Sequence, residues 1–166
     1  MDIQPISPIS SPTLFDKSNP NIQVLVRVRP LNSKEIQEGA RSCLFLDSQD
    51  PSKITLDTKP EQKVFYFDFV AGKVVSQVGL FDIVGRPLAE ICIEGYNICI
   101  FAYGQTGAGK THTMQGRFDK NEEWGLQPKV FEYLFDLIAR EKESEFCLKV
   151  TYLEIYNEQI NDLVIF

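Results

Sequence analysis

Residues 104–111, Gly-Gln-Thr-Gly-Ala-Gly-Lys-Thr, constrain the fold more than any other stretch of the chain. They fit the pattern Gly-x-x-x-x-Gly-Lys-Ser/Thr, which binds phosphate where it joins a strand to a helix. The apolar run 98–103 before the motif predicts that strand, and residues 110–114 predict the start of the helix. The sequence therefore predicts a phosphate-binding loop rather than an ordinary glycine-rich turn.

The residue types of this loop suit the binding of a polyphosphate. Glycine adopts backbone angles that other residues resist, so successive N–H groups can point at one anion. The N-terminus of the following helix adds partial positive charge. Lys110 is expected to reach the outer phosphates, and Thr111 to offer its hydroxyl to Mg²⁺.

Composition limits the class of protein. The chain has 166 residues, 43% of them hydrophobic and 24% charged, which suits one globular domain. No apolar run approaches the roughly 20 residues that span a bilayer, and no signal-peptide pattern is expected at the N-terminus. The net charge is −6, without a basic patch, which argues against a nucleic-acid binder.

The four cysteines are far apart in the sequence, and three lie in apolar runs. This pattern predicts buried free thiols in a reducing compartment rather than disulfides. No pair has the spacing of metal ligands, and a single histidine leaves little for a zinc site. The cysteines are Cys43, Cys92, Cys99 and Cys147.

The order of expected elements begins with a disordered leader rich in serine and proline, residues 1–20. Alternating apolar residues predict a strand over 21–30, which Pro30 ends, and residues 32–39 predict a turn or short helix. Three short apolar strands separated by turns predict an antiparallel meander. These strands cover residues 43–46, 53–56 and 64–67.

The second half of the chain alternates helices and strands. Ser76 is the expected N-cap of an amphipathic helix to about residue 93, which Pro87 breaks or restarts. After the phosphate loop we expect a polar loop at 116–125 and a helix with Pro128 in its first turn. A strand over 146–155, a turn at Asn157–Glu158 and an apolar stretch over 160–166 follow. This order predicts an α/β layered domain.

Four motifs, in matching order and spacing, resemble the kinesin motor domain. Residues 101–114 closely resemble its phosphate loop, and residues 26–32 its first strand. Residues 94–97 and 153–163 resemble the lead-in to the phosphate-loop strand and a later strand with its turn. Residues 130–135 and 139–143 are most similar to the branch with phragmoplast- and spindle-associated kinesins. The likeness implies that residues 21–166 are the N-terminal half of a motor domain of the P-loop NTPase type, with a central mostly parallel or mixed sheet flanked by helices.

The resemblance implies a set of residues that bind ATP or ADP with Mg²⁺. Arg27, Arg29 and Pro30 would border the adenine, and His112 would stack near it. Their own pattern leaves another interpretation open, because the arginines alternate with valines as solvent-facing strand residues do. The phosphates would be held by Gly104, Gln105, Thr106, Gly107, Ala108, Gly109, Lys110 and Thr111, with Thr111 also at the metal.

The resemblance further implies an ATP-dependent microtubule motor with microtubule-stimulated ATPase activity. Its partners would be microtubules, with no nucleic acid and no membrane. A dimer would form through a coiled coil that these residues do not contain. The implied location is the cytoplasmic microtubule cytoskeleton, with the spindle as one site for the suggested branch.

Two family patterns that sense the γ-phosphate do not occur in the 166 residues: Asn-x-x-Ser-Ser-Arg-Ser-His and Asp-x-x-Gly-Ser-Glu. No catalytic residue is therefore assigned. Asp47 and Asp57 each follow a predicted strand, but both precede the phosphate loop and are disfavoured as metal ligands. We expect this stretch alone to hold nucleotide without turnover, and its half-sheet to expose apolar edges.

Two other interpretations stay open. The chain could be a stand-alone nucleotide-binding or regulatory module that does not hydrolyse its ligand. It could also be an unrelated small P-loop kinase or nucleotidase, which the four matching motifs disfavour.

Overall fold

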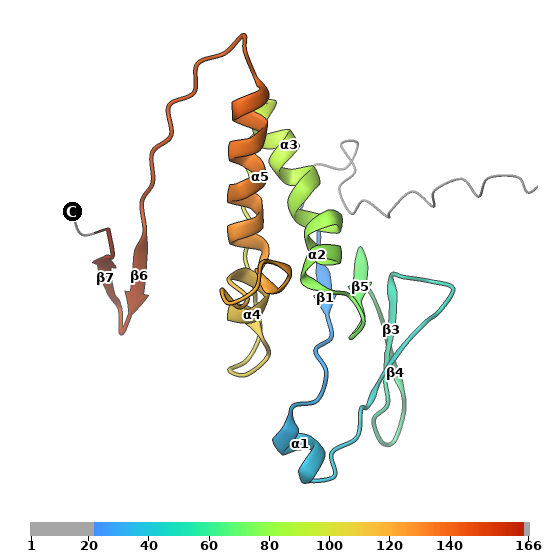
Figure 1. Ribbon diagram of the computed structural model, residues 1–166. Helices are drawn as coiled ribbons and strands as arrows, with labels where there is room; N and C mark the ends of the chain where they lie inside the picture. Colours follow the sequence, from blue (N-terminus) through green and yellow to red (C-terminus); the bar gives the residue numbers. More distant parts are fainter. Residues whose placement is uncertain (1–21, 165–166) are drawn as a thin grey trace, which may run out of the picture.

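The computed structural model describes residues 22–164 (Figure 1). The predicted leader at residues 1–20 lies outside the described residues. Within the described part, a strand and a short helix come first, four short strands follow, the other helices come next, and two strands come last. None of its helices has the length and apolar character required to cross a membrane.

The first strand, β1 (Leu25–Arg27), pairs in parallel with β5 (Phe69–Ala71). The register places Val26 opposite Val70, and the Val28 N–H donates to the Ala71 carbonyl at 2.8 Å. The strand is shorter than the predicted range 21–30, because hydrogen bonds from one parallel neighbour define its length. Its carboxyl end leads directly to Arg29 and Pro30.

The predicted antiparallel meander is confirmed. It consists of β2 (Leu44–Leu46), β3 (Lys53–Leu56) and β4 (Lys63–Tyr66), in this spatial order. Ile54 of β3 is buried and packs with Val28 and Val70, so an apolar cluster anchors the meander to the parallel pair.

The helical stretch after Ser76 contains a change of helix type. The Ser76 hydroxyl accepts the Gly79 N–H at 3.0 Å, which confirms the predicted N-cap of α2 (Gln77–Leu80). A π-helical turn (Phe81–Gly85) connects α2 to α3 (Arg86–Ile93). Pro87 lies in the first turn of α3, where a missing N–H is tolerated, so the predicted restart is confirmed.

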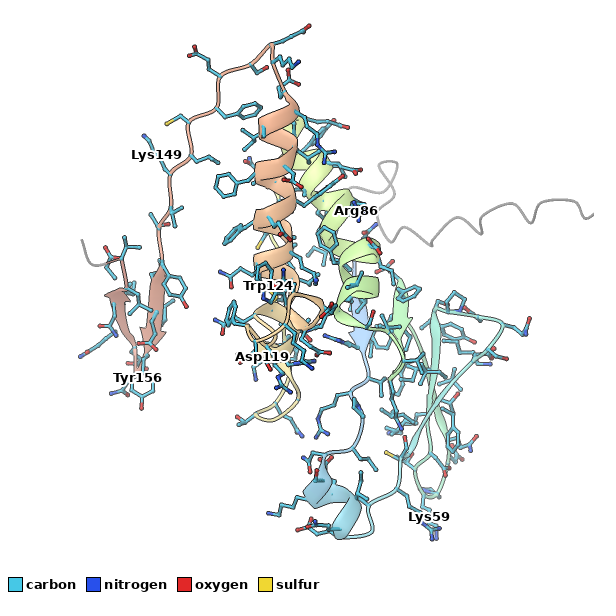
Figure 2. The ribbon with its side chains drawn as sticks, in the orientation of Figure 1. Lys59, Arg86, Asp119, Trp124, Lys149 and Tyr156 are labelled. Atoms are coloured by element: carbon cyan, nitrogen blue, oxygen red, sulfur yellow. The ribbon has the colours of Figure 1, made fainter. Side chains whose placement is uncertain are left out.

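Two helices follow the phosphate motif as predicted, α4 (Lys110–Met114) and α5 (Leu126–Arg140). A loop that contains a 3₁₀ turn (Asn121–Glu123) joins them, and Figure 2 labels Asp119 and Trp124 in this region. Helices α3 and α5 run side by side in Figure 1.

The strand predicted over residues 98–103 is wrong for the described structure. No strand is formed there, because none of the described strands provides a hydrogen-bonded neighbour. Ile98 and Ile100 instead line an apolar groove of about 280 Å³ with α3 and α5. Phe101 and Tyr103 in the same segment are 75% and 95% exposed.

The last elements form a separate hairpin of β6 (Leu153–Tyr156) and β7 (Gln159–Asp162). The predicted turn is confirmed: Asn157 and Glu158 have φ of 50° and 62°, as a tight two-residue hairpin requires. The strand is much shorter than the predicted range 146–155, since only its end has a partner. Figure 1 shows the hairpin apart from α5, and Figure 2 labels Tyr156 near its tip.

The prediction of buried thiols is wrong. Cys43, Cys92, Cys99 and Cys147 are free, but all four are exposed. At Cys99 the cause is alternation along the chain, since its neighbours Ile98 and Ile100 line the groove beside α3 and α5 and Cys99 itself is exposed.

The main helical core lies where α2 and the π-helical turn meet α5. Leu80, Phe81 and Leu126 form its buried centre. The Phe81 ring meets the Tyr133 ring edge-on at 5.7 Å, and the Arg86 guanidinium lies 5.1 and 4.8 Å from these two ring centres. Arg86 is labelled beside α3 in Figure 2. This packing fixes the helices that support the phosphate motif.

We predict that Leu80→Ala lowers the free energy of unfolding by about 2–5 kcal/mol, because it leaves a cavity in this core. Leu80 is 1% exposed, whereas Val78 in the same helix is 42% exposed. Val78→Ala is therefore the matched control, with a loss below about 1 kcal/mol. Urea unfolding followed by circular dichroism measures both, and equal losses would contradict the assignment of the core.

Candidate nucleotide site

The phosphate motif adopts a compact loop with glycine-dependent geometry. Gly104, Gly107 and Gly109 have φ of 152°, 81° and 102°, which residues with a Cβ rarely adopt. Gly109 also precedes α4, so the loop ends at the start of a helix. The loop and the start of the helix therefore form as the motif predicts, without the strand expected before them.

Lys110 folds back over its own loop. Its Nζ donates to the carbonyls of Gly104 at 2.8 Å and Gln105 at 3.1 Å. This places an ammonium charge against the loop that the glycines shape. Thr111, the next residue of α4, is exposed.

A cleft of about 330 Å³ lies between the carboxyl end of β1 and the phosphate loop. The structure brings together seven of the predicted site residues here: Arg27, Arg29, Pro30, Gly107, Ala108, Gly109 and His112. The other predicted residues do not line the cleft and belong to the adjoining loop and first turn of α4. They are Gly104, Gln105, Thr106, Lys110 and Thr111.

Arg27 is engaged by protein groups on the inner side of the cleft. Its Nη1 donates to the Gln77 Oε1 at 2.8 Å and to the Thr113 Oγ1 at 3.0 Å. Burial lowers the pKa of Arg27, and the nearby charge of Glu123 partly offsets that effect. Arg27 therefore connects β1 to α2 and α4, a role that the strand pattern did not indicate.

Gln77 is a site residue that the sequence analysis missed. Its side chain is 4% exposed, and its Nε2 donates to the His112 carbonyl at 2.6 Å and the Glu123 carbonyl at 3.4 Å. The residue follows the Ser76 N-cap, and only its tertiary contacts distinguish it from an ordinary first-turn glutamine.

Glu35 is a second residue that the analysis missed, although a sequence signal existed. Asn32 and Glu35 have the spacing of a capping box, and both of its hydrogen bonds form at the start of α1 (Ser33–Gln37). Glu35 also pairs with Arg29 at 2.6 Å. The hydrogen bond from Arg29, then that from the Asn32 backbone, lowers the pKa of Glu35 from 4.5 to about 2. The pair therefore stabilises the fold above about pH 4.5, and this contribution is lost as the pH falls towards 2.

The described residues fit a polyphosphate better than they fit a protein-built metal centre. The loop geometry and the Lys110 ammonium suit phosphate oxygens. Residues 22–164 contain no group of three His, Cys, Asp or Glu side chains that could hold a metal ion. Asp47 caps a turn in the meander and pairs with Lys53 at 3.0 Å, while Asp57 accepts from Gln62.

A family model for the kinesin motor domain matches residues 27–165. The chain belongs to the kinesin motor domain family. The match begins at the last residue of β1 and includes the phosphate loop and all five α-helices of the described structure. The predicted family is therefore confirmed.

Individual kinesins show the extent of the likeness. The chain is 46% identical over 156 residues to the kinesin-like protein KIN-12E of Oryza sativa subsp. japonica. The aligned region covers 87% of this chain and 8% of that protein. It is 44% identical over 159 residues to the kinesin-like protein KIF15 of Mus musculus, covering 86% of this chain and 11% of that protein. The chain thus spans a small part of the relatives that it matches.

A solved kinesin shows the same fold. The structure, described as that of a fast kinesin with implications for ATPase mechanism and interactions with microtubules, superposes with a TM-score of 0.80 at 37% identity. The match covers 86% of this chain and 40% of that chain. The predicted α/β class of P-loop NTPase type is confirmed, although the described strands form three small sheets.

We predict that Gln77→Leu lowers the free energy of unfolding by about 1–3 kcal/mol, because it leaves buried hydrogen-bonding groups without their partner. The affected groups are the Arg27 guanidinium and the carbonyls of His112 and Glu123. Gln62→Leu, at an exposed position, is the control and stays within about 0.5 kcal/mol. Chemical unfolding measures both, and an unchanged Gln77→Leu midpoint would refute this role.

Proposed function

We propose that this chain binds ATP or ADP and forms the nucleotide-binding part of a kinesin motor. The observation that carries the proposal is the cleft in which the carboxyl end of β1 meets the phosphate loop and His112. Membership of the kinesin family supports it, because the loop and the strand end both lie within the matched residues 27–165. Mg²⁺ is the proposed companion of the nucleotide.

The phosphates would lie on the loop of residues 104–111. The backbone N–H groups of Gly107 and Gly109 would face them, with the Lys110 ammonium close by. The exposed Thr111 hydroxyl would supply one ligand to Mg²⁺. Mg²⁺ at such sites takes its other ligands largely from phosphate oxygens and water, so one protein hydroxyl suffices for binding.

The base would lie towards Pro30 and His112. A proline ring and an imidazole both offer flat or apolar surface to a purine. Arg29 contributes mainly the face of its guanidinium, since most of its N–H groups are bonded to protein acceptors. Lys73 also lines the cleft, which adds a positive charge on the side of β5.

In the complete protein we propose an ATPase that microtubules stimulate and that moves along them, in the cytoplasmic microtubule cytoskeleton and including the spindle. Dimerisation through a coiled coil, without nucleic acid or membrane as partner, belongs to the same proposal. Family membership supports this assignment. For residues 1–166 alone we propose nucleotide binding without hydrolysis, because the two patterns that sense the γ-phosphate do not occur in them.

A non-hydrolysing nucleotide-binding or regulatory module is the second candidate. It is favoured by a formed phosphate loop in a stretch of 166 residues that lacks the two patterns that sense the γ-phosphate. It differs from the first candidate only in what the complete protein does.

We predict that Lys110→Ala weakens binding of Mg·ADP by about 30- to 100-fold, because a charge-assisted contact to phosphate is lost. Lys129→Ala is the matched control, since Lys129 also donates to a backbone carbonyl, that of Asn121 at 2.8 Å, but lies outside the loop. Isothermal titration calorimetry measures both. Equal affinity of the Lys110→Ala variant and the unchanged chain would sink the proposed function.

We predict that residues 1–166 alone release no phosphate from ATP above background, with or without microtubules. The physical reason is that a phosphate loop positions the nucleotide but does not position the attacking water. A steady-state phosphate-release assay, with an active kinesin motor as positive control, measures this. Clear stimulation by microtubules would show that the chain carries its own catalytic groups.

A further inference from the structure

The guanidinium of Arg29 is almost fully occupied by protein acceptors. Its Nε donates to the Gly107 carbonyl at 3.0 Å, and its Nη1 donates to the Pro30 carbonyl at 2.9 Å. The carboxylate of Glu35 accepts from Nη1 at 2.8 Å and from Nη2 at 2.6 Å. An arginine side chain has five N–H donors. Four bonds therefore leave one donor for any ligand.

The contact with Gly107 falls on the middle of the phosphate loop. The peptide bond between Gly107 and Ala108 is held from both ends: its carbonyl accepts from Arg29, and its N–H donates to the Gln105 carbonyl at 3.1 Å. A peptide unit is planar, so these two bonds fix the orientation of the whole unit. Gly107 has a φ of 81° and no Cβ to restrict it, so an external contact is what holds this conformation.

Glu35 in turn is held by the backbone of its own helix. Its Oε2 accepts the Asn32 N–H at 2.8 Å, and the Asn32 side chain accepts the Glu35 N–H at 2.9 Å. The carboxylate is thus fixed at the N-terminus of α1 before it meets Arg29. A bidentate pair of this kind also fixes the plane of the guanidinium. A continuous set of hydrogen bonds therefore runs from α1 through Arg29 to the phosphate loop.

We propose that Glu35 is a positioning residue for the phosphate loop, acting through Arg29 and the Gly107–Ala108 peptide to hold the loop in the conformation described above. The proposal rests on the proposed nucleotide binding. Arg29 then has two roles, since it borders the base and also holds the loop. Loss of Glu35 is expected to weaken binding of the phosphate part of the nucleotide and to leave the preference among bases unchanged.

The first test compares Glu35→Gln with Glu38→Gln. Both substitutions remove one carboxylate charge near α1, but Glu38 is exposed and pairs only with Lys34, at 3.9 Å. Calorimetry measures the affinity for Mg·ADP, Mg·GDP and Mg·pyrophosphate. We expect Glu35→Gln to weaken all three by a similar factor, about three- to tenfold, and Glu38→Gln to leave them unchanged. A loss confined to ADP would place the effect at the base and overturn the proposal.

Arg29→Lys keeps the positive charge but loses the fork that reaches Glu35 and Gly107 together. We expect it to weaken pyrophosphate binding at least as much as Glu35→Gln does. The double variant should lose little more than Arg29→Lys alone, because both residues act through one set of bonds. Fully additive losses would show that Glu35 acts elsewhere.

A second measurement needs no ligand and separates this proposal from the proposed function. Amide hydrogen exchange at Ala108, followed by NMR, reports the opening of the loop. We expect Glu35→Gln to accelerate it about three- to tenfold and Glu38→Gln to leave it unchanged. Unchanged exchange at Ala108 overturns the positioning role. A different result separates the two proposals. If Lys110→Ala leaves the affinity for ADP unaltered while Glu35→Gln accelerates exchange at Ala108, the proposed nucleotide binding fails, but the role of Glu35 in holding the loop stands.

Discussion

The buried amide of Gln77 joins the three segments on which the candidate site depends. Its oxygen accepts from Arg27 of β1, and its nitrogen donates to the carbonyls of His112 in α4 and Glu123 in the following loop. Each bond is worth only about 1 kcal/mol net, but an unpaired buried partner costs about 1–3 kcal/mol. Displacing any one segment would therefore leave a buried polar group without its partner. This coupling keeps the strand end and the phosphate loop on opposite sides of one cleft.

Three cations of the candidate site are held by protein acceptors before any ligand arrives. Arg27 bonds Gln77 and Thr113, Arg29 bonds Glu35 and Gly107, and Lys110 bonds its own loop. A side chain held in this way loses little rotamer freedom on binding, so less of the interaction is offset by ordering. In return, the two arginines have fewer free N–H groups to offer a ligand. They would therefore contribute to ligand binding mainly through their shape and charge.

The elements around the site are packed to different extents. Helices α2, α4 and α5 share a packed core, and the meander is attached through Ile54, Val28 and Val70. The segment before the phosphate loop, by contrast, has no strand partner and exposes Phe101 and Tyr103. Helical packing and the contacts of β1 therefore hold the loop in the described structure, rather than neighbouring strands of a sheet.

The sequence by itself determined the local elements: the meander, the Ser76 cap, the α4 and α5 helices and the Asn157–Glu158 turn. These depend on local backbone preferences. It also determined the phosphate loop and the family, because both depend on motifs of fixed spacing. It also indicated Arg29, Pro30 and His112, which meet in one cleft. Only the tertiary structure decided which strands form, that the cysteines are exposed, and that Gln77 bonds Arg27 and His112. Strand pairing, burial and these side-chain contacts depend on residues that are distant in the chain, so a local sequence pattern does not predict them.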